Sequence, residues 1–414
     1  MLALPVLALT LGGILARPRG LSEWVYAVAG ALAMVGLGLI SPGDAGVALL
    51  AQWNVFLFFL GLMVIAGAAD ESGLVERLTV VAARAAFGRR DVLLVLVCGL
   101  AVLVTITLSN DATILVLTPL VVTMAARLGV PALPFAYACA YLANASSALL
   151  PAANPANVIL LGAAPIRVLD YLGELAFPAL AASVFTVAYL LVSFARELRG
   201  PVAVPIADRR DATASLVGAA IAAIVVAYVV ALDRGFPVGV VAIAGAALVL
   251  AILRLRGALE AARVARDVEW SVFPFLAGLV VVVTAAENAG LVDAIAAALR
   301  ELAAFGAAGL VMIGVATALA ANVMNNLPAV LLIGSAVGRL APRPDLPALV
   351  AAVLVGIDIG PNFTTIGSLA TLMWILVLRR RGVVVTSGEY LKRSAFPSAA
   401  ALLVALALVA LRPR

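Results

Sequence analysis

Two hydrophobic segments of this sequence are interrupted by clusters of polar side chains and prolines. The first interruption, 143–157, contains three asparagines, two serines and two prolines; the second, 358–371, contains an aspartate, an asparagine, three threonines, a serine and a proline. Each proline removes a backbone donor and clashes with the preceding turn, so neither segment is expected to form one unbroken helix. Irregular backbone at membrane depth is tolerated only where it is buried in protein or lines a cavity. Because the two interruptions occupy matching places in the two halves of the chain, they predict the two sides of one binding site.

The side chains at these interruptions are mostly amides and hydroxyls, which offer donors and acceptors without fixed charge. Two further polar clusters, at 109–111 and 322–326, break other hydrophobic runs. Such a lining suits a small neutral polyhydroxy solute, whereas an anion site would favour Arg or Lys, which these stretches lack. Half-helix ends could still help to hold an anion. The predicted substrate-binding residues are Asn110, Asn144, Ser146, Ser147, Asn154, Asn157, Asn325, Asn326, Asn362, Thr364, Thr365 and Ser368.

These side chains have an alternative role. Asn, Ser and Thr often join transmembrane helices by hydrogen bonds, without any substrate. That role accounts well for any one of them taken alone. Because four polar clusters occur at matching places in the two halves, a substrate-binding role is favoured for these side chains taken together.

Asp111 and Asp358 are the predicted proton-coupling residues. An unpaired carboxylate in a low-dielectric site favours its protonated form and can exchange a proton during transport. The chain contains no histidine, so any proton coupling must use carboxylates. Asp111 begins an apolar run, where it could instead cap a helix as an ionised group. Asp70, Glu71 and Glu287 end their spans, and we expect capping roles for them at the membrane interface.

The elements that hold these residues are predicted to be membrane-spanning helices. The chain is 65% hydrophobic and 12% charged, with a mean hydropathy of +1.19, whereas average chains are roughly 25% charged. Apolar runs long enough to span a bilayer recur along the whole length. We therefore predict an all-α polytopic membrane protein with about ten spanning helices, two re-entrant helical hairpins and two broken helices at the midplane. The first run, 2–16, precedes its nearest arginines, which indicates a mature helix and not a signal peptide.

The rest of the composition excludes several function classes. The net charge of +5 is scattered over short loops and does not indicate nucleic-acid binding. Cys98 and Cys139 lie in apolar runs, where packing roles are expected and a disulfide is not. Two cysteines cannot build a metal site by cysteine coordination, and no cofactor is expected.

An internal repeat divides the chain. Residues 53–75 align with 270–292 at a constant offset of 217. The first repeat is predicted over 1–196, with a hairpin tip near 109–111 and a broken helix at 134–164. A cytoplasmic linker, 197–212, separates it from the second repeat, 213–414, which has a hairpin tip near 322–328 and a broken helix at 346–379. The aligned identities include Trp53/Trp270, Phe56/Phe273, Phe58/Phe275, Gly61/Gly278 and Gly73/Gly290.

The distribution of basic residues predicts the orientation. If both hairpins turn back within the membrane, 20 of the 27 Lys and Arg residues fall on one face. The positive-inside rule makes that face cytoplasmic. Both termini are then extracytoplasmic, and the two repeats have opposite topology. The remaining seven basic residues are Arg167, Arg234, Arg300, Arg339, Arg343, Arg412 and Arg414.

Four segments carry a family resemblance: 70–73 (Asp-Glu-Ser-Gly), 110–119 (Asn-Asp-Ala-Thr-Ile-Leu-Val-Leu-Thr-Pro), 324–328 (Met-Asn-Asn-Leu-Pro) and 360–372 (Gly-Pro-Asn-Phe-Thr-Thr-Ile-Gly-Ser-Leu-Ala-Thr-Leu). Nearly end to end, the chain resembles the ArsB-type arsenite/antimonite efflux permeases of the broad ion-transporter superfamily. The resemblance implies export of arsenite and antimonite across a prokaryotic cytoplasmic (inner) membrane, in exchange for protons and sometimes with a cytosolic ArsA-type ATPase. It also implies the inverted-repeat fold with two re-entrant hairpins. Membrane lipid is also an expected partner, and the protein is not expected to be an enzyme.

Two transporters and one class of enzyme remain as alternatives. A sodium-coupled dicarboxylate carrier of the same superfamily would place Asp111 next to a dianion, which is repulsive. A sodium/proton antiporter is harder to exclude, because carboxylates and amide oxygens also suit Na⁺. An intramembrane aspartyl protease requires a Gly-x-Gly-Asp motif, but residues 355–358 are Val-Gly-Ile-Asp. A serine protease requires a general base, and the chain has no histidine.

Overall fold

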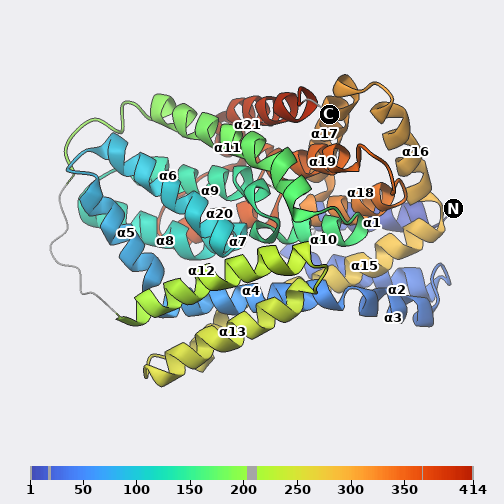
Figure 1. Cartoon of the computed structure of the whole chain (residues 1–414), viewed down its shortest axis with the longest axis horizontal. Coiled ribbons are helices and arrows are strands. Elements are labelled where there is room, and N and C mark those ends of the chain that lie inside the picture. The colour runs from blue at the N-terminus through green and yellow to red at the C-terminus, as the bar shows by residue number, and fades with distance from the viewer. Residues whose placement is uncertain (1, 17–19, 203–211, 366, 413–414) are drawn as a thin grey trace.

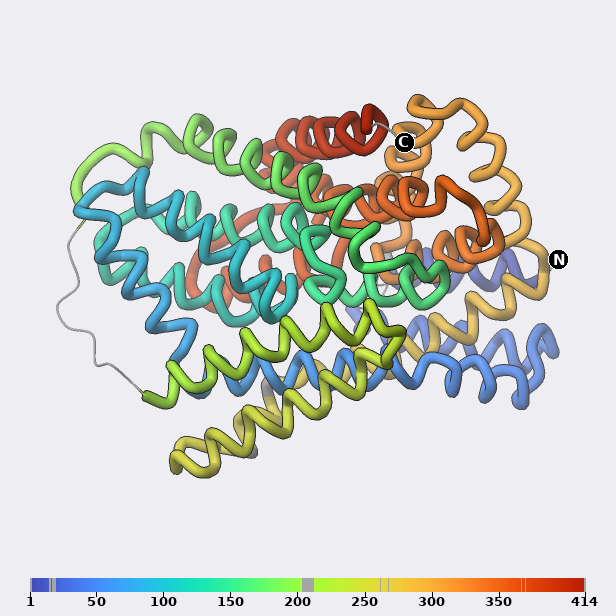
Figure 2. The backbone as a smooth tube through the Cα atoms, viewed as in Figure 1, coloured from blue at the N-terminus to red at the C-terminus, as the bar shows by residue number. Residues whose placement is uncertain are grey.

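The computed structural model describes residues 2–16, 20–202, 212–365 and 367–412, and within them the chain forms helices and loops without a β-strand. Nine helices in this part of the chain are long and apolar enough to cross a membrane, or up to ten if one pair bent by 76° is counted as a single span. The prediction of an all-α polytopic membrane protein is confirmed. Figure 2 shows the chain as one elongated helical bundle.

The helices of the first half of the chain all end before residue 196. In order they are α1 (Ala3–Ala16), α2 (Glu23–Gly36), α3 (Pro42–Ala51), α4 (Trp53–Glu71), α5 (Leu74–Ala85), α6 (Arg90–Thr107), α7 (Asn110–Ala112), η2 (Thr113–Leu117), α8 (Thr118–Leu128), α9 (Leu133–Ala145), η3 (Ser147–Leu149), η4 (Pro151–Ala153), α10 (Pro155–Ala163) and α11 (Val168–Ser193).

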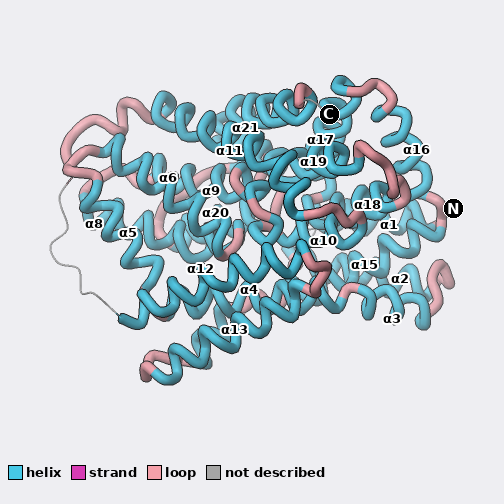
Figure 3. Tube along the Cα trace, in the orientation of Figure 1, coloured by secondary structure: helices cyan, strands magenta, loops and turns pink. Residues whose placement is uncertain are grey.

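The second half follows the same order of long, amphipathic and broken helices. It contains α12 (Ala212–Asp233), α13 (Val238–Leu255), α14 (Ala261–Asp267), α15 (Val272–Asn288), α16 (Leu291–Ala303), α17 (Ala307–Met324), α18 (Asn326–Gly338), α19 (Leu346–Ile359), η5 (Gly360–Phe363), α20 (Leu369–Arg380) and α21 (Ser387–Ala410). Figure 3 shows the loops that interrupt helices inside the bundle as well as those that join them at its ends.

Some elements differ from the sequence expectation. The last span was expected from 398, but α21 begins eleven residues earlier, at Ser387. Its start is a capping box, in which Thr386 and Glu389 each accept a hydrogen bond from the other residue's backbone N–H. The short helices α3 and α14 were not expected. Residues 203–211 of the predicted linker lie outside the described part of the chain.

The two halves are interleaved at the repeated helices. α4 packs against α13 of the other half, and α15 packs against α2. A Cβ on Gly61 would lie 2.5 Å from the backbone of Ala242, and a Cβ on Gly278 would lie 2.5 Å from that of Ala27. The missing side chain at each repeated glycine therefore allows close helix crossing, as small residues do in membranes. The repeat-equivalent residues Phe56 and Phe273 stack on each other, with ring centroids 6.5 Å apart.

The two amphipathic helices lie at opposite ends of the bundle, with α5 toward the left and α16 toward the right in Figure 1. Each carries an acid in its first turn that faces an arginine at the end of a hairpin helix. Arg127 of α8 is 3.9 Å from Glu76, and Arg339, after α18, is 2.9 Å from Asp293. Glu76 and Asp293 differ by the repeat offset of 217, so the two halves build the same contact at opposite ends.

We predict that Gly278→Ala destabilises the protein by about 1–3 kcal/mol, because the new methyl group would collide with the α2 backbone at a crossing that cannot widen freely. The measurement is the midpoint of thermal aggregation of the purified protein in detergent, followed by size-exclusion chromatography.

The matched control is Gly99→Ala in α6, since nothing lies within 4 Å of a Cβ there. Equal midpoints for the two variants would contradict the role assigned to this crossing.

Candidate substrate site

Four helices begin inside the bundle, and a short polar side chain caps each of them. Ser109, Asn154, Asn325 and Ser368 each accept a hydrogen bond from a backbone N–H in the first turn of the helix that follows. Such caps satisfy donors that the helix itself leaves unpaired. The four helix N-termini are also regions of positive potential.

The first broken helix is held open by its own polar side chains. α9 ends at Ala145, and the chain passes through two 3₁₀ turns before α10 starts. Asn157 Nδ2 donates to the backbone oxygen of Ser147 at 3.0 Å, and the Tyr171 hydroxyl donates to that of Ala148 at 3.0 Å. Carbonyls released by the break are thus paired without water.

The second broken helix is tied to the neighbouring hairpin. Asn322 Nδ2 donates to the backbone oxygen of Gly360 at 2.7 Å, and the Asn322 Oδ1 accepts from the Thr364 hydroxyl at 2.8 Å. The Asn326 N–H donates to the Gly367 carbonyl at 3.0 Å. The hairpin tip α17–α18 and the break between α19 and α20 therefore form one hydrogen-bonded unit.

The two broken helices meet in a fully buried polar cluster. Asn144 Nδ2 donates to Asn362 Oδ1 at 2.8 Å, and Asn154 Nδ2 donates to Asp358 Oδ1 at 2.7 Å. All four residues are at most 3% exposed. Ser147 and Asn157 lie close enough to the Asp358 carboxylate to interact with it. We define these six residues as the central cluster.

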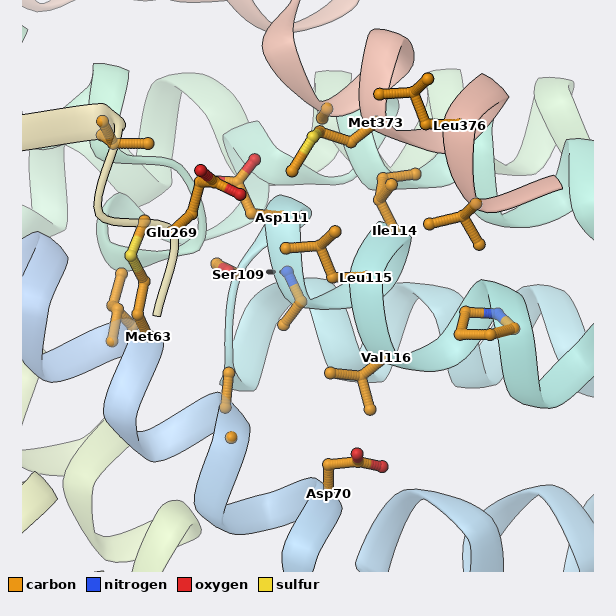
Figure 4. Close-up of a pocket in the computed structure, with 18 of the residues that line it drawn as sticks. Met63, Asp70, Ser109, Asp111, Ile114, Leu115, Val116, Glu269, Met373 and Leu376 are labelled. Atoms are coloured by element: carbon orange, nitrogen blue, oxygen red, sulfur yellow. Dashed lines mark hydrogen bonds between the residues drawn. The ribbon is translucent and has the colours of Figure 1, made fainter. Parts of the chain in front are cut away.

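A cavity of about 500 Å³ reaches Pro155, the residue after Asn154, but no residue of the central cluster lines it. Its lining includes Ser109 and Asp111 at the tip of the first hairpin and Pro155 at the start of α10. Asp111 interacts electrostatically with Glu269, and Figure 4 shows these two carboxylates together at one end of the cavity, with Asp70 at the other end. Figure 4 also shows apolar walls from η2 and α20.

The structure does not bring all predicted substrate-binding residues to one point. Asn144, Ser147, Asn154, Asn157 and Asn362 belong to the central cluster. The other predicted residues form hydrogen bonds within the protein. The Ser146 hydroxyl donates to Leu142 O, Asn110 Oδ1 accepts from the N–H of the next residue, and Asn325 and Ser368 cap helices. The hydroxyls of Thr364 and Thr365 donate to Asn322 and Ser387, and the Asn326 N–H donates to Gly367 O.

Several residues of the site were not among the predicted substrate-binding or proton-coupling residues, although Asn322 belongs to the predicted polar cluster 322–326. Tyr171 and Asn322 pair the broken backbone, and Glu269 lines the cavity. One signal was present in the sequence: Asn144-x-Ser146-Ser147 matches Asn362-x-Thr364-Thr365 at an offset of 218. This match would have paired the two asparagines that contact each other. Tyr171 and Glu269 lie in different segments, with no motif to link them.

Comparison with known proteins identifies the family. The CitMHS family, described as citrate transporter, matches residues 13–357. The chain belongs to this family. Over all of this chain and 99% of theirs, the arsenical pump membrane proteins of Yersinia enterocolitica and Escherichia coli are 30% and 28% identical to it. The predicted resemblance to the ArsB-type permeases is confirmed, and the family and these relatives are transporters.

A solved structure shares the fold. The YdaH transporter of Alcanivorax borkumensis, described as having an unusual topology, is 18% identical and matches with a TM-score of 0.55 over 85% of this chain and 84% of its own. At this identity the likeness concerns the arrangement of helices alone.

We predict that Asn154→Ala destabilises the protein by about 2–4 kcal/mol, because it removes the α10 cap and the donor to a buried carboxylate. Thermal midpoints in detergent are the measurement. The double variant Asn154→Ala/Asp358→Asn should be more stable than Asn154→Ala alone, because the buried carboxylate that has lost its donor is then replaced by a neutral amide.

The control is Ser41→Ala, which removes an exposed cap from α3 and should cost only about 1 kcal/mol. Additive effects of the two substitutions at Asn154 and Asp358 would contradict the direct bond.

Proposed function

We propose that this protein is a secondary active exporter of arsenite and antimonite that exchanges the solute for protons and confers metalloid resistance. The observation that carries the proposal is the buried contact of the two broken helices, through the Asn144–Asn362 and Asn154–Asp358 bonds. Polar groups at membrane depth mark solute pathways. The whole-length similarity to arsenical pump membrane proteins supports this choice of solute.

The chemistry of the central cluster agrees with arsenite as the solute. Near neutral pH arsenite is mostly an uncharged trihydroxide, which amides and hydroxyls can bind by hydrogen bonds. The cluster contains no Arg or Lys that would retain an oxyanion. An exporter must also release its solute, and hydrogen bonds release it more readily than a set of thiolates would.

Two carboxylates are positioned for proton coupling. Asp358 is fully buried and accepts a hydrogen bond from Asn154. Asp111 lines the cavity and faces Glu269. A buried carboxylate without a cationic partner is a group that can take up and release a proton during a transport cycle.

The proposed membrane arrangement has two inverted repeats with re-entrant hairpins, at α6–α8 and α17–α18. The positions of α5 and α16 at opposite ends of the bundle support opposite topology (Figure 1). The cavity lining includes Arg266, Arg380 and Arg381 of the predicted cytoplasmic face. The described conformation would therefore face the cytoplasm, with both termini outside.

The family description favours one second candidate, a carrier of citrate-like carboxylates. Asp111 and Asp358 argue against it, because a polycarboxylate beside either group would be repelled. A sodium/proton antiporter is the other alternative. The transport experiment below separates all three.

We predict that everted membrane vesicles containing the protein accumulate arsenite when their interior is acidic, since proton efflux would then drive arsenite inward. Asp111→Asn or Asp358→Asn should abolish gradient-driven accumulation, because an amide cannot carry the proton. The measurement is arsenite uptake with and without the pH gradient, in vesicles from cells that lack other arsenite exporters.

Asp44→Asn, an exposed carboxylate at the start of α3, is the matched control and should transport normally. Absence of arsenite uptake in vesicles that contain folded protein would refute the proposed solute, and citrate or Na⁺ transport would identify the alternative.

We predict that alkaline phosphatase fused to either terminus is active in whole cells, because both termini should be extracytoplasmic. A fusion placed after α5 should be inactive and the same reporter after α16 active. Equal activity after the two amphipathic helices would contradict the inverted topology.

A further inference from the structure

The central cluster contains three buried acceptor oxygens that have no hydrogen-bond donor among the described residues. They are Asn144 Oδ1, Asn157 Oδ1 and Asp358 Oδ2. Their residues are at most 1% exposed. Leaving a buried acceptor unpaired costs about 1–3 kcal/mol, so each such atom needs an explanation. These three oxygens belong to one cluster, to which both broken helices contribute.

The orientation of Asn144 follows from a backbone carbonyl. Asn362 Nδ2 is 3.0 Å from the Tyr141 carbonyl, which can only accept, so the nitrogen of Asn362 must lie on that side. The Asn362 oxygen then faces Asn144 and requires a donor. Asn144 Nδ2 supplies it at 2.8 Å, and the Asn144 oxygen is left open.

Backbone groups orient the other two acceptors in the same way. Asn157 Nδ2 faces the Ser147 carbonyl at 3.0 Å, so the Asn157 oxygen points elsewhere. Asn154 Oδ1 accepts the Ala156 N–H at 3.0 Å, which turns Asn154 Nδ2 toward Asp358. That bond occupies Asp358 Oδ1 and leaves Oδ2 open.

The hydroxyl protons nearby are already used. Ser147 donates to the Asn144 carbonyl at 2.8 Å and Ser146 to the Leu142 carbonyl at 2.6 Å. Tyr171 donates to a backbone oxygen, as described above. When Asp358 is deprotonated, the unsatisfied groups of the cluster are therefore all acceptors. A ligand that satisfies them must donate hydrogen bonds.

We propose that Asn144, Asn157 and Asp358 determine specificity by accepting hydrogen bonds from the hydroxyls of a neutral trihydroxy solute, and that boric acid is therefore also a ligand. The inference rests on the proposed function in taking the central cluster as the substrate site. Three open acceptors equal the number of hydroxyls of arsenous and boric acids. Arsenate and citrate offer mainly acceptors and negative charge, so the site rejects them. Hard cations such as Ca²⁺ and Mg²⁺ gather six or more oxygens, which exceeds the three that are open.

The test is competition binding to the purified full-length protein at neutral pH. Arsenite binding is measured by titration calorimetry, alone and with boric acid, arsenate, citrate or NaCl at equal ionic strength. Boric acid should weaken arsenite binding competitively, whereas the other three should not. Displacement by arsenate or citrate, or no effect of boric acid on a protein that binds arsenite, would overturn the assignment.

Asp358→Asn tests the acceptor role directly. Because Asn154 must still donate to an oxygen, the new amide nitrogen would take the place of Oδ2 and turn an acceptor into a donor. Arsenite and boric acid affinities should both fall by roughly 10- to 100-fold. Ser183→Ala, which removes a buried hydroxyl from α11, is the control and should bind both normally.

The outcomes separate this inference from the proposed function. Boric acid binding that depends on Asp358, without arsenite binding or transport, would support the acceptor site and refute the exported solute. Arsenite transport by the wild-type protein, together with unchanged arsenite affinity in Asp358→Asn, would refute the acceptor site alone. Stabilisation by Na⁺ that Asp358→Asn abolishes, without any effect of boric acid, would assign the same oxygens to a cation. If Asp358→Asn does not fold, Asn157→Ala and the wild-type competition still decide the matter.

Discussion

The rest of the structure depends on one constraint: backbone groups freed by a broken helix have no water to bond at membrane depth. Four helices of this protein start inside the bundle, and each start is capped by a serine or an asparagine. At the two broken helices, carbonyls released by the break accept hydrogen bonds from Asn157, Tyr171 and Asn322. The polar residues at these breaks therefore divide into two sets. One set pairs the backbone groups, and a smaller set retains acceptor oxygens that have no donor among the described residues.

The smaller set owes its geometry to the larger one. Three of the four amides in the central cluster are oriented by a backbone carbonyl or N–H, and backbone groups cannot exchange the roles of donor and acceptor. The orientation of Asn144 is thereby determined two steps away, at Tyr141. Such a site is preorganised, because binding does not require the amides to turn. The proposed preference for ligands that donate hydrogen bonds follows from this fixed orientation.

Close crossing of the repeated helices holds the two halves together. The first half supplies Gly61 and α2, and the second supplies Gly278 and α13, so neither half completes its packing alone. The broken helices then meet from opposite halves. Phe56 contacts Phe273, and Asn144 contacts Asn362, so residues that match between the two halves lie side by side.

The sequence by itself determined the class of protein and the places where its helices break. Hydropathy indicates the spans, and prolines next to amides indicate the breaks, because both signals are local and act through backbone chemistry. The early start of α21 was missed although its capping box is also local, since charged residues at 389–393 masked the helical signal. Contacts between segments were not determined in this way. Which oxygen of Asp358 stays open depends on Asn154, which is 204 residues away. Only the tertiary structure decides this, because these hydrogen-bond partners are close in space although they are far apart along the chain.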